Sequence, residues 1–146
     1  MIVTVDANIL FSALITPAGR LAKIISYPAL PAQLVSVHYL IEELAKHHNR
    51  IVYFSKKPEH AVLELKQSYL KNIVLYDETL IHERYWLEAE SLTDDIDHFD
   101  VSYVALALQI GGPLWTGDKK LTAHLKMKGF NRVVNTAELY ELLNIG

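Results

Sequence analysis

The clearest chemical signal in this sequence is a set of acidic residues at predicted strand ends and helix starts. Asp6 follows the apolar strand 2–5, Asp100 opens an apolar helix, and Asp118 follows a short strand at 114–116. The carboxyl ends of parallel strands meet at one edge of a sheet, where ligands bind. Carboxylates about 4 Å apart repel by roughly 4 kcal/mol per pair at an effective dielectric of 20. Since a hard divalent cation reverses that repulsion, the pattern predicts an all-oxygen site for Mg²⁺ or Mn²⁺.

Each of these acids also has a purely structural interpretation. Asp6 could cap the helix that follows it, but Asn8 is at least as good a cap and would leave Asp6 without that role. Asp118 could likewise cap the next helix. The segment 94–100 contains four acids, whereas one cap and one partner for the dipole of the helix opened by Asp100 explain only two. The remaining acids of this segment favour a site that binds a cation.

Charge is distributed unevenly along the 146 residues, although the net charge is only −3, which does not indicate a general nucleic-acid binder. Residues 77–100 contain nine acids and one base, and residues 119–137 contain five bases and no acid. Two solvated helix faces would explain this pattern. The functional interpretation is an acidic centre with a basic flank that holds a polyanion.

Composition and length narrow the class of protein. The chain has no cysteine, which excludes disulfides and thiolate metal sites, and its seven histidines lack the spacing of a zinc protease. The apolar runs are too short to span a bilayer, and no basic segment precedes the first one. We therefore expect a single domain over residues 1–146, located in the cytoplasm and not associated with a membrane.

Five short strands alternate with helices, and no hairpin signal separates any two strands. This order predicts an α/β fold, a three-layer α/β/α sandwich around a central parallel sheet of four to five strands. The predicted strands are 2–5, 33–37, 73–76, 114–116 and 132–134. The predicted helices are 9–15, 19–27, 38–48, 58–70, 78–92, 99–110, 121–128 and a last helix capped by Thr136 and ending at Leu143.

Four stretches of the sequence resemble the PIN domain family, which includes the VapC-type toxins, and the resemblance covers essentially the whole chain. They are Val5–Leu10, Leu40–Leu44, Asp97–Ala107 and Leu114–Leu121, with Ala7 standing where threonine is commoner. The resemblance implies the sheet order 3-2-1-4-5.

The resemblance also implies which residues form the site. Four carboxylates would be catalytic and bind metal, and a fifth acid would assist them. These are Asp6, Glu43, Asp100 and Asp118, with Asp97 as the assisting metal ligand and with Asn8 and Thr116 as supporting polar residues. Glu43 is selected over Glu42 by the resemblance alone, because both flank the apolar face of their helix.

The implied function is a metal-dependent ribonuclease that hydrolyses phosphodiesters of single-stranded or structured RNA with Mg²⁺ or Mn²⁺. An antitoxin protein is a candidate partner, and a homodimer is expected. The cations expected to hold RNA phosphates are Lys119, Lys120, Lys126 and Lys46, with Arg50 beside Lys46.

Three other functions fit parts of the pattern. A phosphoacceptor receiver domain needs an acid pair near the first strand, which supplies only one acid, and a phosphorylated aspartate, for which Asp77 is the only candidate. A flap-type DNA nuclease shares the acidic chemistry but has an additional helical arch, for which this chain is too short. A non-catalytic PIN-like interaction module is the third alternative.

Overall fold

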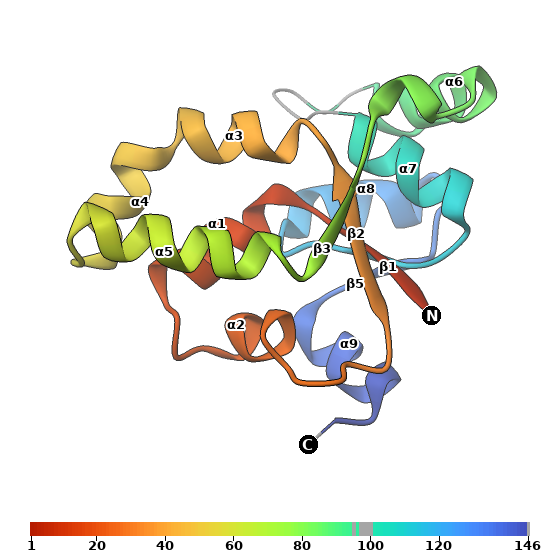
Figure 1. Ribbon diagram of the computed structural model, residues 1–146. Coiled ribbons are helices and arrows are strands. Elements are labelled where there is room, and N and C mark those ends of the chain that lie inside the picture. The colour runs from red at the N-terminus through yellow and green to blue at the C-terminus, as the bar shows by residue number, and fades with distance from the viewer. Residues whose placement is uncertain (95, 97–100, 146) are drawn as a thin grey trace.

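The computed structural model describes residues 1–94, 96 and 101–145, and its centre is a parallel β-sheet (Figure 1). The five-stranded sheet has the order β3-β2-β1-β4-β5, with every neighbouring pair parallel. The strands are β1 (Ile2–Val5), β2 (Gln33–Val37), β3 (Ile73–Tyr76), β4 (Leu114–Trp115) and β5 (Val133–Val134). The predicted fold class and strand order are confirmed.

Helices form a layer on each side of this sheet. They are α1 (Ala7–Ile15), α2 (Arg20–Ile25), α3 (Leu40–Lys46), α4 (His48–Ser55), α5 (Glu59–Leu70), the 3₁₀ helix η1 (Glu78–Leu80), α6 (Glu83–Thr93), α7 (Ser102–Ile110), α8 (Lys119–Met127) and α9 (Thr136–Leu143). Helix α1 packs against α2, α3, α4 and α5, whereas α7 packs against the sheet and against α6, which also contacts α8. Among the described helices, none has the length and apolar character needed to cross a lipid bilayer.

The central strands are buried on both faces, as expected for a parallel sheet between two helical layers. Val3, Val5, Val35 and Val37 have no exposed surface. Their branched side chains pack well on a pleated, buried strand. The packed sheet is therefore the rigid base from which the loops of the site project.

Two glycines bring β4 next to β1. Gly111 ends α7 in the left-handed conformation with φ of 85°, which a residue without a Cβ adopts at little cost. A Cβ on Gly112 would lie 2.0 Å from the carbonyl oxygen of Ile2, so only glycine fits against the first strand. This close approach aligns the carboxyl ends of β1 and β4.

Several local predictions were wrong. The helix predicted over 78–92 is the 3₁₀ helix η1 followed by α6, with residues 81 and 82 between them. The single helix predicted over 38–48 is two helices, α3 and α4, separated at His47, and α4 was not anticipated. Only Ile51 of α4 is buried while Tyr53 and Phe54 are exposed, so its apolar residues do not mark one helical face. The last helix is capped not by Thr136 but by Asn135, which forms a reciprocal capping box with Glu138.

Candidate active site

Strand register places Asp6 beside Thr116 at the carboxyl edge of the sheet. Thr4 pairs with Leu114 and Val5 with Trp115, so the next residue on each strand, Asp6 or Thr116, lies at the same level. The Asp6 backbone N–H continues the ladder by donating to the Trp115 carbonyl at 3.0 Å. The Thr116 hydroxyl then donates to Asp6 Oδ2 at 2.7 Å, which fixes the orientation of the carboxylate.

The Thr116 hydroxyl oxygen is the centre of a small network. It accepts hydrogen bonds from Asn8 Nδ2 at 3.3 Å and from the Asp118 backbone N–H at 3.1 Å. With its donated bond to Asp6, the hydroxyl uses its one proton and both lone pairs. Asn8 Oδ1 in turn accepts from the Gly117 backbone N–H at 3.2 Å. The loop after β4 is therefore tied to the start of α1.

This network changes the structural interpretation of Asn8 and Asp6. Asn8 lies within the first turn of α1, which begins at Ala7, so the expectation that Asn8 caps this helix was wrong. Asp6 occupies the N-cap position, yet its side chain makes no capping hydrogen bond. The Asp6 carboxylate therefore does not act as the hydrogen-bonding cap of α1.

The environment of Asp6 disfavours its charge. The side chain is buried at 4% exposure, and burial raises the pKa of Asp6 to about 7. The hydrogen bonds from Thr116 and the Ala7 backbone lower the pKa, while the negative charges of Glu43 and Asp118 raise it further. Glu43 and Asp118 therefore lie near enough to Asp6 for their charges to act on it. A bound cation would relieve both the burial penalty and the repulsion.

Glu43 is held in place by a residue that sequence reasoning missed. It lies on α3, and its Oε1 accepts a hydrogen bond from the Tyr103 hydroxyl of α7 at 2.8 Å. Tyr103 is buried at 1% exposure, within the apolar helix that follows Asp100 in the sequence. The only sequence signal was the hydroxyl itself, because a buried tyrosine normally finds a hydrogen-bond partner.

Asp118 caps helix α8, as its structural interpretation predicts. Its Oδ1 accepts from the Leu121 backbone N–H at 3.0 Å and so caps α8. No hydrogen bond to the second oxygen, Oδ2, is present within the described part of the chain. Asp118 can therefore cap a helix with one oxygen while its charge acts on Asp6.

Two of the predicted acids, Asp97 and Asp100, lie outside the described residues. Within residues 1–94, 96 and 101–145, no three His, Cys, Asp or Glu side chains are grouped closely enough to hold a metal ion. The described part of the site thus consists of Asp6 with the charges of Glu43 and Asp118 acting on it.

The predicted phosphate-binding lysines lie in different parts of the structure, and only two of them line a cavity beside Thr116. Lys119 and Lys126 line a cavity of about 350 Å³ whose wall includes Thr116 and Gly117. Lys120 is exposed on α8 and is not among the residues lining that cavity. Lys46 lies on α3, where its ammonium group donates to the Tyr39 hydroxyl, and this hydrogen bond raises the pKa of Lys46.

Comparison with known proteins gives one family and one fold. The family model described as the PIN domain matches residues 4–137. The crystal structure of VapBC2 from Rickettsia felis, bound to a DNA fragment from their promoter, superposes with a TM-score of 0.66 at 14% sequence identity. The alignment covers 92% of this chain and 98% of that one, and at this identity the likeness concerns the fold. No curated protein matches the chain.

Proposed function

Because the chain belongs to the PIN domain family, we propose that it is a metal-dependent endoribonuclease with its active site at the carboxyl ends of β1 and β4. The observation that carries the proposal is Asp6. It is a buried carboxylate, held by Thr116, subject to the charges of Glu43 and Asp118, and not used as a helix cap. A carboxylate in such surroundings destabilises a fold unless a cation or a proton compensates it.

The chemistry of the donor set fits Mg²⁺ or Mn²⁺. Asp6, Glu43 and Asp118 offer carboxylate oxygens, and the chain has no cysteine to attract a softer metal. We propose that Asp6, Asp100 and Asp118 together hold the ion, with Asp97 assisting, and that Glu43 binds the ion or positions its water, as the family resemblance implies. A divalent ion bound there supplies an acidified water and charge neutralisation at the scissile phosphate.

The chain's own side chains then have distinct roles in hydrolysis. Thr116 fixes the Asp6 carboxylate, and Asn8 fixes Thr116, so the key oxygen atoms are preorganised before substrate binds. Tyr103 donates to one oxygen of Glu43 and so orients that carboxylate, which can accept a proton from the attacking water. Lys119 and Lys126 offset the negative potential of the acids and hold the neighbouring phosphates of RNA.

A protein partner is part of the proposal. The R. felis structure is described as VapBC2 bound to a promoter DNA fragment, and its fold matches over nearly all of this chain. We propose that the present chain is likewise the nuclease toxin of a toxin–antitoxin pair, controlled by an antitoxin protein, and that it forms a homodimer.

The test is cleavage of fluorescently labelled single-stranded RNA by the purified chain with Mn²⁺ or Mg²⁺. The Asp6→Asn variant should lower kcat by at least about a hundredfold, because losing a metal ligand costs more than losing an outer partner of one. Glu141→Gln is the matched control, since it makes the same carboxylate-to-amide change at an exposed position on α9. Equal activity of Asp6→Asn and wild type would refute the site, and no cleavage by the wild type with either metal would refute the function.

A further inference from the structure

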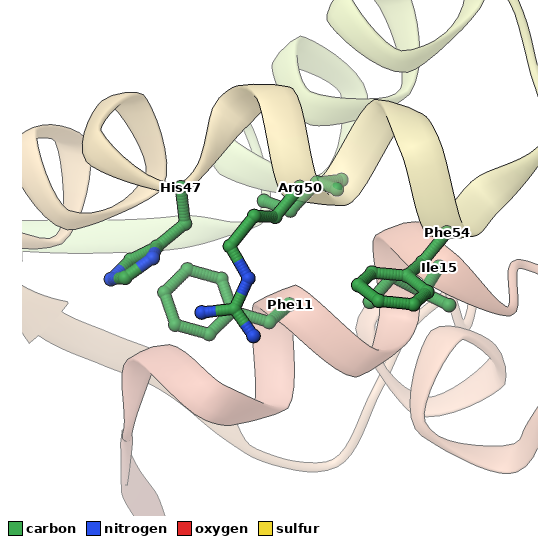
Figure 2. Close-up of a pocket in the computed structure, with 6 residues that line it drawn as sticks. Phe11, Ile15, His47, Arg50 and Phe54 are labelled. Atoms are coloured by element: carbon green, nitrogen blue, oxygen red, sulfur yellow. The ribbon is translucent and has the colours of Figure 1, made fainter.

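A second cavity lies between α1 and α4, and none of the residues that line it is acidic (Figure 2). It has a volume of about 140 Å³ and is lined by Phe11, Ile15, His47, Arg50, Ile51 and Phe54. The ring centroids of Phe11 and His47 are 5.1 Å apart, with the ring planes at 70°. We call this the aromatic groove. Its size suits one flat ring system and is too small for a helix or a strand.

One charged side chain belongs to the aromatic groove. Figure 2 shows Arg50 extending from α4 toward the ring of Phe11 on α1. Arg50 is exposed and forms no ion pair with any acid in the described ranges. The aromatic groove therefore combines an apolar, aromatic wall with a cation available to an anion.

The aromatic groove begins one helical turn from the proposed active site on both of its walls. Phe11 follows Asn8 by three residues on α1, and His47 follows Glu43 by four residues at the end of α3. Residues three or four apart lie on the same face of a helix, about one 5.4 Å turn along it. The aromatic groove therefore lies about one helical turn from two residues of the proposed active site.

From these observations we propose that the aromatic groove is a nucleotide subsite of the enzyme. The base next to the scissile phosphate packs against Phe11 and His47, and the phosphate of that nucleotide binds Arg50. This inference rests on the proposed ribonuclease function, because it assigns the neighbouring part of the same substrate. Stacking accepts any base, so the subsite adds affinity without strong sequence preference.

The pairing of an aromatic wall with an exposed arginine favours a nucleotide over an apolar protein segment. A protein segment would use the apolar wall but would leave Arg50 without an anion unless it carried its own acid. A nucleotide satisfies both features with one small molecule, since it has a flat base and a phosphate. Arginine also binds phosphate with a planar fork of donors that a lysine lacks.

The direct test is NMR titration of the metal-free protein with adenosine 5′-monophosphate, adenosine and ribose 5-phosphate. We expect the monophosphate to shift resonances of Phe11, His47 and Arg50, and to bind more tightly than either fragment. Arg50→Gln should weaken the monophosphate by about tenfold, within the range of a charged hydrogen bond, and leave adenosine unchanged. Arg20→Gln is the matched control, because Arg20 is an exposed arginine that stacks on Tyr140 between α2 and α9.

Three results would overturn the nucleotide subsite. One is that none of the three compounds shifts the aromatic groove. Another is that ribose 5-phosphate binds as tightly as the monophosphate, which would leave only an anion site. The third is that the apolar probe anilinonaphthalene sulfonate shifts the aromatic groove while the monophosphate does not, which would indicate a site for a protein segment.

These titrations need no metal and no catalysis, so they separate the subsite from the ribonuclease function. Binding in the aromatic groove without RNA cleavage would refute the function and leave the groove as a nucleotide-binding site. RNA cleavage without binding in the aromatic groove would refute the subsite and leave the ribonuclease function standing. In an active enzyme, Arg50→Gln and Phe11→Leu should raise KM for short RNA about tenfold with kcat within twofold, and Arg20→Gln should change neither.

Discussion

At the scale of single residues, opposite effects act on the charge of Asp6. Its hydrogen bonds from Thr116 and the Ala7 backbone favour the charged carboxylate, whereas its burial and the charges of Glu43 and Asp118 oppose that charge. The opposing effects are larger, because the pKa of Asp6 rises from 3.8 to about 7. In the metal-free protein the carboxylate is therefore protonated over a pH range where it is ionised in the unfolded chain.

This shift makes stability depend on pH. Between pH 4 and 7 the folded state binds a proton at Asp6 that the unfolded state has released, so stability falls as pH rises through this window. A shift of about three units corresponds to a loss of about 4 kcal/mol by pH 8. Asp6→Asn cannot ionise, so in EDTA it should be nearly as stable as wild type at pH 4.5 and more stable by up to that amount at pH 8.

Urea denaturation of both proteins at pH 4.5, 6 and 8 measures this difference. Subtracting the variant's free energy of unfolding from that of the wild type at each pH cancels the titration of groups that both proteins share. A difference in unfolding free energy that stays constant across the three pH values would show that the Asp6 pKa is not raised.

At the scale of elements, Asp118 shows how one residue can serve both a helix and a site. Its Oδ1 caps α8, and its charge acts on Asp6, the residue that follows β1. The cap also sets the position of the loop after β4, because the Asp118 backbone N–H bonds the Thr116 hydroxyl. Capping and metal binding do not exclude each other, since a carboxylate has two oxygens.

Two substitutions separate these roles. Asp118→Asn keeps a good cap and removes the charge, so it should change stability by only a few tenths of a kcal/mol. Asp118→Ala removes both and should cost about 1 kcal/mol of unfolding free energy. If Asp118 binds metal, both variants should lose Mn²⁺-dependent cleavage. Retained activity in Asp118→Asn would instead show that Asp118 is only a cap.

At the scale of the whole molecule, the site joins parts of the fold that lie far apart in sequence. The hydrogen bond from Thr116 to Asp6 spans 110 residues, and that from Tyr103 to Glu43 spans 60. The contributing residues come from the ends of β1 and β4, from α3 and from α7 (Figure 1). A ligand that these residues bind together would therefore bind the folded state and not the unfolded chain, and would stabilise the whole fold.

Metal addition should thus raise the melting temperature. At a hundredfold excess over its Kd, Mn²⁺ should add about 2.7 kcal/mol, or about 5–10 °C for a chain of this size. Differential scanning fluorimetry against NaCl of equal ionic strength controls for general screening. The rise should be absent in Asp6→Asn, and an equal rise in that variant would show that the ion binds elsewhere.

The sequence alone determined the architecture, and position in the sequence selected two residues of the proposed site. Five short apolar strands alternating with helices allow little besides a parallel sheet between helical layers, and the runs 33–37 and 73–76 were correct to the residue. Asp6 and Asp118 could be selected from position, because residues that follow the carboxyl ends of parallel strands lie at one edge of the sheet. Their role as metal ligands stays a prediction. Local pattern was sufficient for these features.

Only the tertiary structure decided how the side chains are used. Helical spacing could not separate Glu42 from Glu43, and it gave Tyr103 no partner, because the bond between Glu43 and Tyr103 forms across two helices from distant parts of the chain. Asparagine is a common N-cap residue, yet the amide of Asn8 forms hydrogen bonds with Thr116 and Gly117. Only the pairing of β1 with β4 brings these residues near Asn8. The aromatic groove has the same origin, since Phe11 and Arg50 meet only when α1 packs against α4. Contacts of this kind depend on register and packing, which local sequence does not encode.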